Sequence, residues 1–222
     1  MEATLYFRPG TCALSEIIVL EWIGQPYRLV RVEKDQTTLP AFRAMSPHGT
    51  VPVMRFGDVV VYENNALLAH LADTNPQLEL APPAGTSERA LLNQWLSYLD
   101  SGFHVAHYPI FKTGKYAPDE KLHPVLVETA KERVAEHLKF VNTHLEELNH
   151  FLLGRRTILD AYFVAIGRWA RRWFDYADRF PAVDRFLVRM DRDNGIRRAK
   201  AIEVGELEAP SGALERLEAF SA

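Results

Sequence analysis

The chain has 222 residues, with 26 Lys and Arg against 29 Asp and Glu, giving a formal net charge of −3. This balance provides no broad basic field, so we expect no nucleic-acid partner. The N-terminus lacks a basic segment leading into an apolar stretch, and no apolar run is long enough to span a bilayer. These features predict a cytoplasmic protein without a membrane partner.

Residues 1–78 alternate between β-rich and helical patterns. Residues 3–7 and 27–32 are rich in β-branched, aromatic and aliphatic side chains and predict two strands. Between them, Leu14, Ile17, Ile18 and Trp22 predict one apolar face of a helix. Because a helix connects the two strands, we expect them to be parallel.

A hairpin is predicted next, because residues 53–56 and 59–62 flank a Gly-Asp pair of the kind that tight β-turns prefer. Asn64 or Asn65 is then expected to cap a helix. With an irregular stretch before the hairpin, the order is βαβ followed by ββα. This order predicts an α/β domain with a thioredoxin-like mixed sheet.

The remainder of the chain has a helical period and few strand signals, which predicts an all-helical bundle. Thr157 and Asp160 are spaced to cap one of its helices reciprocally. Three further apolar stripes predict three other helices. The stripes are Leu91, Trp95, Leu99 and Phe103; Ala130 to Leu148; and Val183, Phe186, Leu187 and Met190.

A Pro- and Gly-rich segment separates the two patterns, since it cannot continue a helix. We therefore divide the chain into a thioredoxin-like domain (1–78), a linker (79–87), a helical domain (88–209) and a C-terminal tail of uncertain order (210–222).

Cys12 is the only cysteine, so it cannot form an internal disulfide. It lies between a strand and a predicted helix, where free N–H groups and the helix dipole favour a reactive thiolate. Cys12 to Ser15 forms a Cys-x-x-Ser sequence, so any disulfide must be mixed with an outside thiol. The alternative is an inert residue packed under the sheet.

Val51-Pro52 directly precedes the first strand of the hairpin. A proline there is either a strand-starting residue or a cis-proline in a tight turn. In the second case the Val51 N–H and C=O are free to pair with an extended peptide. The residues alone leave both interpretations open.

Four short motifs in a fixed order carry a resemblance to a known family: residues 9–12 (PGTC), 49–52 (GTVP), 63–64 (EN) and 157–160 (TILD). The ordered set is similar to that of cytosolic glutathione S-transferases, with the cysteine-bearing bacterial beta class most alike. The resemblance covers the chain to about residue 205. It implies an enzyme that uses glutathione as co-substrate and no metal. Such an enzyme conjugates glutathione to a hydrophobic electrophile, or exchanges it through a mixed disulfide at Cys12, with peroxidase activity as a further option.

The resemblance also implies a glutathione site. Val51 would pair by its backbone with the cysteinyl part, and Pro52 would be cis. Glu63 and Asn64 would hold the γ-glutamyl group, because a carboxylate beside a helix N-terminus meets both its ammonium and its carboxylate. The alternative for Glu63 is a solvated charge. The remaining expected glutathione contacts are Cys12, His48 and Ser97, with Ser97 reaching the partner's ligand in a homodimer.

Two positions depart from the family pattern. Asn64 stands where the family usually has Ser, or Gly in some beta-class members, and it can donate through its amide and its backbone N–H. Phe7 stands where beta-class members have a Tyr, so that hydroxyl is absent. Tyr6 is expected to point to the other face of the strand.

His104 matches a beta-class histidine over the thiol and is expected to be catalytic together with Cys12, by hydrogen bonding or proton transfer. His107, one turn later, is expected to share the cavity. The alternative is that both are ordinary surface histidines, since neighbours at this spacing need no role. The pair lacks a third ligand nearby, so no metal site is expected.

Aromatic residues of the helical part are candidates for an apolar pocket that takes the electrophile, although most such residues are core. Nearby arginines, Arg168, Arg171 and Arg172, suggest an anionic substrate, with a solvated helix face as the alternative. The complete expected pocket is Thr11, His107, Tyr108, Phe111, Trp169 and Trp173, of which Trp169 matches a beta-class pocket residue.

A second function is open, because fold does not fix function. The chain could be a non-catalytic module of the same fold that serves protein interaction or a stress response. The retained Cys12, Val51 and Glu63 argue against it.

Overall fold

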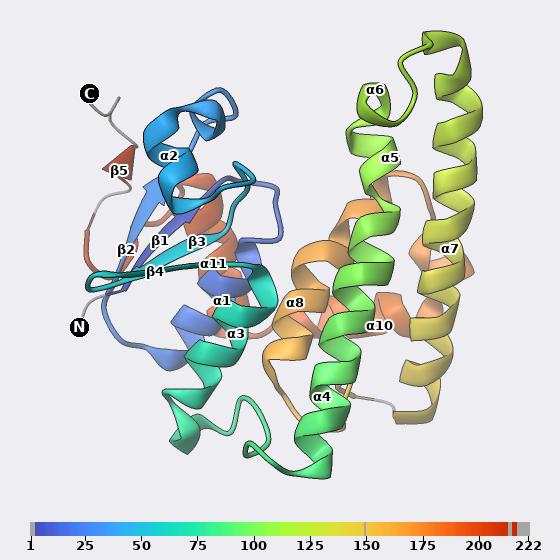
Figure 1. The fold of residues 1–222 in the computed structure, drawn as a ribbon. Helices are drawn as coiled ribbons and strands as arrows, with labels where there is room; N and C mark the ends of the chain where they lie inside the picture. The colour runs from blue at the N-terminus through green and yellow to red at the C-terminus, as the bar shows by residue number, and fades with distance from the viewer. Residues whose placement is uncertain (1–2, 149, 213–214, 217–222) are drawn as a thin grey trace.

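A five-stranded mixed sheet with helices on both faces is formed mainly by the first part of the chain, and helices make up nearly all of the rest (Figure 1). This computed structural model describes residues 3–148, 150–212 and 215–216. The predicted thioredoxin-like domain followed by a helical bundle is confirmed as the fold class.

The sheet has the order β4-β3-β1-β2-β5. As predicted, β1 and β2 are parallel and a helix connects them, with Leu5 opposite Leu29. The predicted hairpin is antiparallel, and its first strand pairs with β1. The strands are β1 (Ala3–Phe7), β2 (Tyr27–Arg31), β3 (Val53–Phe56), β4 (Val59–Tyr62) and β5 (Glu215–Arg216).

β5 comes from the segment for which the sequence predicted a tail of uncertain order. Its two residues pair in parallel with Val30 and Arg31 of β2. The last strand of the chain therefore lies at the edge of the first domain's sheet. Positions 213–214 and 217–222 of the expected tail lie outside the described residues.

Helices cover the two faces of the sheet unequally. On one face, Phe42 and Met45 of α2 pack with Tyr6 and Val53. Tyr6 and Phe7 belong to different apolar clusters, which confirms that they point to opposite faces of β1. The helices and helical turns of this part are α1 (Leu14–Ile23), η1 (Gln36–Thr38), α2 (Pro40–Met45), α3 (Asn64–Asp73) and η2 (Pro76–Leu78).

The stretch that was expected to be irregular contains η1 and α2. At six residues, α2 is too short to show a helical period in the sequence. Pro40 fits at its first turn because its missing N–H would have no helical partner there.

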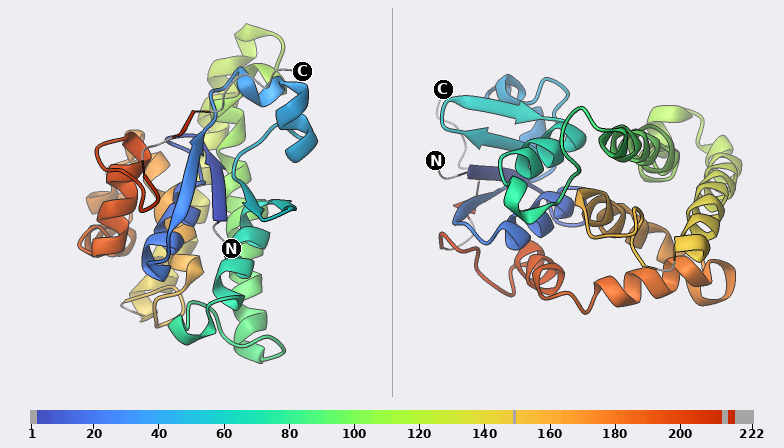
Figure 2. Two further views of the ribbon diagram at one scale, coloured as in Figure 1. Left: turned by 90° about the vertical axis from the view of Figure 1, so that its left-hand side faces the viewer. Right: turned by 90° about the horizontal axis from the view of Figure 1, so that it is seen from below.

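α1 is buried on every side, not on one face as the sequence predicted. All residues from Leu14 to Leu20 are buried. The reason is tertiary: α8 and α11 from the second part of the chain both pack against α1 (Figure 2). Two polar residues of its first turn, Ser15 and Glu16, are consequently inside the protein at 0% exposure.

From Ser87 to Val204, all the described secondary-structure elements are helices or helical turns. They are α4 (Ser87–Tyr98), η3 (Leu99–His104, a π-helix), α5 (Tyr108–Phe111), α6 (Thr113–Tyr116), η4 (Glu120–Leu122), α7 (His123–Leu148), α8 (Ile158–Gly167), η5 (Arg168–Arg172), α9 (Tyr176–Arg179), α10 (Pro181–Met190) and α11 (Asn194–Val204). Within these described residues, none of the helices combines the length and the apolar character needed to cross a bilayer.

The predicted apolar stripes are largely buried, with exceptions at helix ends. Leu91 and Leu148 are exposed, so the first stripe begins at Leu92 and Trp95, and the second ends at Leu145. All four predicted side chains of α10 are buried.

The start of α8 confirms the capping box. The Thr157 N–H donates to Asp160 Oδ2 at 2.8 Å, and the Leu152 N–H donates to Asp160 Oδ1 at 2.9 Å. Asp160 is fully buried, and burial raises the pKa of its carboxyl to about 6. One carboxyl group thus fixes both the start of α8 and the loop that precedes it.

We expect Asp160→Ala to lower the free energy of unfolding by about 2–4 kcal/mol, because two buried N–H groups lose their acceptor. Urea unfolding of both proteins measures the difference. Asp119→Ala is the matched control: Asp119 caps the exposed η4 through the Lys121 N–H, and its loss is expected to cost no more than about 1 kcal/mol. Equal losses in the two variants would contradict this assignment.

Candidate functional site

The loop between β1 and α1 carries Cys12, whose side chain is 6% exposed. Its Sγ lies 3.9 Å from the carbonyl oxygen of Val51, at hydrogen-bond distance for sulfur. The Val51–Pro52 peptide bond is cis, so the turn alternative for this proline is the correct one. The thiol therefore faces the backbone of the turn that precedes β3.

Cys12 is held as the neutral thiol. Burial raises its pKa well above the ordinary range, and the charges of Glu16 and Asp100 raise it further. The prediction that the start of α1 favours thiolate is therefore wrong for this structure. The first-turn N–H groups do favour the anion, but desolvation of the sulfur outweighs them.

Glu63 and Asn64 lie where β4 meets α3. Glu63 is exposed and has a φ of 79°, a conformation that side-chain-bearing residues rarely adopt. Such strain is concentrated at functional sites. The Glu63 carboxylate thus stands in water beside the N-terminus of α3, whose first N–H groups have no intrahelical acceptor. Contrary to prediction, Glu63 itself is the N-cap residue and Asn64 is the first helical residue.

The side chain of Asn64 is turned into the protein, unlike the expected ligand-facing amide. It is 6% exposed, and its Oδ1 lies 3.1 Å from Ser15 Oγ, while its Nδ2 is buried without a partner. The backbone N–H of Asn64 remains available at the start of α3.

His104 is at the end of the π-helix η3 and is buried at 7% exposure. Its Nδ1 lies 2.9 Å from the Tyr162 hydroxyl, which donates to Asp100 Oδ1 at 2.9 Å. Because the tyrosine proton is used for Asp100, Nδ1 of His104 must carry the hydrogen in its own contact. Hydrogen bonds from His104 and Tyr162 hold the pKa of Asp100 below its usual value.

His107 is completely buried. Its Nδ1 donates to the Phe103 carbonyl at 2.8 Å, so Nε2 carries no hydrogen and can only accept. Among the described residues, Nε2 has no hydrogen-bond partner. Burial lowers its pKa to about 4, so the ring is neutral at pH 7. The alternative that His104 and His107 are surface histidines is therefore wrong.

The aromatic candidates lie against these histidines. Trp169 packs edge-on against both rings, with centroids 5.0 Å from His104 and 5.3 Å from His107. The ring centroids of Phe111 and Trp173 lie 5.8 Å and 5.9 Å from that of His107. This brings most of the expected apolar pocket into one cluster.

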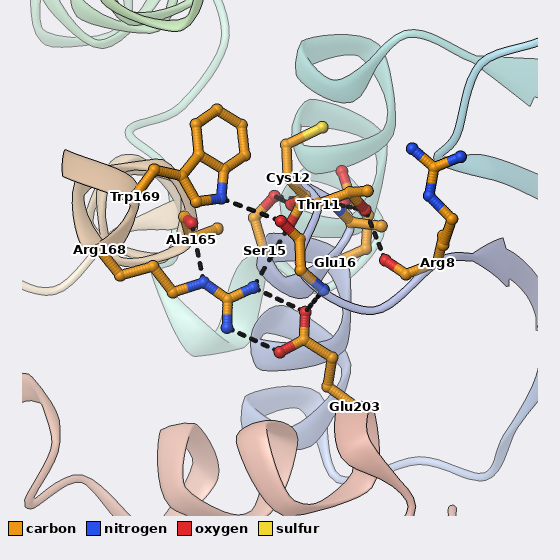
Figure 3. A network of polar contacts seen from close by, with 11 residues as sticks. Arg8, Thr11, Cys12, Ser15, Glu16, Ala165, Arg168, Trp169 and Glu203 are labelled. Carbon is orange, nitrogen blue, oxygen red and sulfur yellow. Dashed lines mark hydrogen bonds and ion pairs between the residues drawn. The ribbon is translucent and has the colours of Figure 1, made fainter. Parts of the chain in front are cut away.

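Figure 3 shows how the helical part holds the cysteine loop. The Trp169 indole N–H donates to the Gly10 carbonyl at 3.0 Å, and the Gly10 N–H donates to Glu203 at 2.9 Å. Arg168 binds both Glu203 carboxylate oxygens, at 2.6 and 2.7 Å, and its guanidinium reaches the Thr11 carbonyl at 3.4 Å.

The arginines therefore do not form the anion site that the sequence suggested. Arg168 is committed to Glu203, and Arg171 pairs with Asp184 at 2.8 Å. Arg172 lies over the rings of Phe111 and Trp173.

Two of the expected glutathione contacts form no hydrogen bond with the other site residues described above. His48 is exposed in the loop before Val51, and Ser97 is exposed on α4. Within the described ranges, neither side chain forms a hydrogen bond to Cys12 or Glu63.

The fold adds basic residues that the sequence analysis missed. Lys112 Nζ lies 4.7 Å from the Tyr108 ring centroid. Burial lowers the pKa of Lys112, and the charges of Lys115, Arg8 and Lys34 lower it further. Arg8 and Lys34 are far from Lys112 in sequence, and the fold brings their charges within reach of Lys112, which also responds to Cys12. Among the residues described, no three His, Cys, Asp or Glu side chains are grouped to hold a metal ion.

Comparisons with known proteins agree with this geometry. Residues 17–79 match the family described as Glutathione S-transferase, N-terminal domain. Glutathione S-transferase GstA of Escherichia coli O157:H7 is 31% identical over 173 residues, which cover 75% of this chain and 81% of that protein.

Solved structures extend the similarity to the whole fold. A sphingomonad glutathione S-transferase complexed with glutathione is 28% identical, with a TM-score of 0.81 over 90% of this chain and 98% of that one. A bacterial beta class glutathione S-transferase from Sphingomonas chungbukensis is 26% identical, with a TM-score of 0.80 and coverage of 90% and 98%.

We expect Arg168→Met to lower the free energy of unfolding by about 3 kcal/mol, because it leaves the buried Glu203 carboxylate without its cation. Thermal unfolding checks this value. Arg171→Met is the control, since its partner Asp184 lies in a more solvated pair and the loss is expected to stay below about 1 kcal/mol. A similar small effect for both would show that the Glu203 network does not stabilise the fold.

His107 gives a pH-dependent prediction. The pKa of His107 is lower in the folded protein than in the unfolded chain. Between about pH 6.5 and pH 4, His107 is therefore protonated in the unfolded chain but neutral in the folded protein. This stabilising contribution is complete above pH 6.5 and is lost progressively toward pH 4, by about 3 kcal/mol in total. His107→Gln should therefore show a shallower acid loss of stability than wild type in urea titrations. If the free energy of unfolding of wild type and of His107→Gln fell equally with decreasing pH, His107 would not be neutral and buried.

Proposed function

The chain belongs to the glutathione S-transferase family, and from this membership we propose that it binds glutathione along Cys12, Val51 and Glu63 and conjugates it to a hydrophobic electrophile. The observation that carries this proposal is the position of the Cys12 thiol, whose Sγ lies 3.9 Å from the Val51 carbonyl oxygen.

Glutathione is a short extended peptide with one ammonium and two carboxylates. The Val51 backbone pairs with its cysteinyl unit, as a strand edge pairs with a peptide. Glu63 receives the γ-glutamyl ammonium, and the free N–H groups at the start of α3 receive the neighbouring carboxylate. Lys112, whose pKa responds to Cys12, supplies positive charge for the glycyl carboxylate.

Cys12 acts as a hydrogen-bond donor in this mechanism. The Cys12 S–H faces the Val51 carbonyl, and glutathione paired with Val51 brings a second sulfur close to it. The S–H then donates to the glutathione sulfur and stabilises its thiolate, which attacks the electrophile. A thiol whose pKa is raised by burial suits this role better than that of nucleophile.

The electrophile is placed by the aromatic cluster. Tyr108, Phe111, Trp169 and Trp173 supply an apolar surface beside His104 and His107. We assign His104 the role of assisting proton transfer during conjugation, and its hydrogen bond to Tyr162 supports this role by orienting the ring.

Two finer features follow the family resemblance. We place the protein in the cytoplasm and in a homodimer, with Ser97 reaching the partner's glutathione. Exposed apolar residues on β4 and α4, Val59 and Leu91, support burial of these elements in a protein interface.

Cys12 substitutions test the mechanism. Cys12→Ala removes the donor and is expected to lower kcat/KM for conjugation by about tenfold to a hundredfold, whereas Cys12→Ser keeps a donor and most of the activity. Reduction of a small glutathionyl disulfide, which needs a sulfur nucleophile, is expected to vanish in both variants. Steady-state assays of both reactions separate the roles.

The controls address binding and function separately. Retention of wild type on immobilised glutathione tests the site itself, and Glu63→Gln should raise KM for glutathione while changing kcat little. Failure of wild type to bind would remove the enzyme assignment in favour of an interaction module. Equal loss of conjugation in Cys12→Ala and Cys12→Ser would remove the donor role and favour exchange through a mixed disulfide.

A further inference from the structure

Beneath the cysteine loop, three side chains of α1 and α3 form a buried polar cluster: Ser15, Glu16 and Asn64. Glu16 is 0% exposed and appears beside Ser15 in Figure 3. Its Oε2 lies 3.1 Å from Ser15 Oγ, and its Oε1 has no hydrogen-bond partner among the residues that the structure describes. Among the described residues, neither Lys nor Arg forms an ion pair with this carboxyl group.

The number of protons available limits the possible states of this cluster. Ser15 Oγ lies 2.7 Å from the Cys12 carbonyl oxygen and 3.1 Å from both Glu16 Oε2 and Asn64 Oδ1. A hydroxyl has one proton to donate, so it cannot donate to all three of these oxygens. When the Ser15 proton is directed to the carbonyl, which is at the shortest distance, the Glu16 contact is a hydrogen bond if Glu16 carries a proton and donates it to Ser15.

We propose that Glu16 is held as a neutral carboxylic acid and is a positioning residue for Cys12. Its O–H donates to Ser15, and Ser15 donates to the Cys12 carbonyl, so the chain of donors fixes the cysteine loop. Neutral Glu16 also keeps negative charge away from the sulfur site. Burial independently raises the pKa of Glu16 to about 8.

Within the described part of the chain, no Lys or Arg forms an ion pair with Glu16 that would compensate its charge. Cys12 on its own loop and Tyr162 from α8 are the titratable groups that its charge affects. From α3 it meets the neutral amide of Asn64 through Ser15. Glu203 of α11 bonds to the same loop but is neutralised by Arg168, and Asp100 of η3 adds a further negative charge near Cys12. Ionised Glu16 would therefore oppose any thiolate at this site.

The test uses the fact that Cys12 is the only cysteine, so modification by a small methylthiolating reagent reports this sulfur alone. Wild type and Glu16→Gln are compared from about pH 6.5 to pH 9.5, since Gln keeps a neutral donor at this position. The rates are expected to agree at the acidic end. Above about pH 8.5 the variant should react faster, by up to about tenfold, because one neighbouring charge shifts a pKa by on the order of one unit.

Glu21→Gln is the matched control on the same helix. Glu21 pairs with Arg198 and Tyr27, so its replacement should leave the pH profile of Cys12 modification unchanged. A ratio of Glu16→Gln to wild-type rates that stays constant with pH would overturn the proposal.

A second measurement needs no variant. The infrared spectrum of wild type should contain a protonated-carboxyl band that persists at pH 7 and disappears near pH 8. Absence of such a band at pH 7 would also overturn the proposal.

The catalytic importance of Glu16 rests on the proposed function, but these readouts do not. Thiol modification and infrared titration need neither glutathione nor turnover. Failure to bind immobilised glutathione would remove the transferase assignment while leaving the neutral Glu16 in place. A pH-independent rate ratio in a protein that binds glutathione would remove only the role of Glu16.

Discussion

The position of the reactive loop depends on one buried carboxylate, that of Glu203. It is 2% exposed and binds the Arg168 guanidinium and the Gly10 N–H together. Each partner comes from a different region: α11, η5 and the loop after β1. A buried carboxylate without such partners would be costly, so these three segments must assemble together. The geometry around Cys12 is therefore set by residues near the other end of the chain.

The same assembly decides the chemistry of the loop. Because α8 and α11 enclose α1, its first turn is removed from water, and Ser15 and Glu16 become internal polar groups. A helix N-terminus in solvent would favour thiolate at Cys12. Enclosed in this way, the same position favours the neutral thiol, because the desolvation cost of an anion exceeds the benefit of the helix N–H groups.

The sequence was sufficient for features with local causes. The strands, the hairpin and the capping box at Asp160 follow from alternation, turn residues and spacing, and the structure confirms them. It was insufficient where burial or long-range pairing decides the outcome. The sequence suggested an anion contact or a solvated helix face for Arg168, whereas Arg168 pairs with the distant Glu203, and the state of Cys12 depends on how deeply α1 is enclosed. The six residues of α2 are too few to show a helical period of apolar side chains.

Charge is distributed unequally around the two sulfur positions of the proposed reaction. The charge of Asp100 acts on Cys12 from within the protein and raises the pKa of the thiol, and Glu16 has the same effect only when it is ionised. Lys112 adds a positive charge near the same sulfur. In the proposed reaction this cation favours the binding of glutathione, which carries two carboxylates, while burial and the charge of Asp100 keep the proton on Cys12. The negative charge of the thiolate is thereby assigned to the substrate sulfur, and Cys12 keeps the proton that stabilises it.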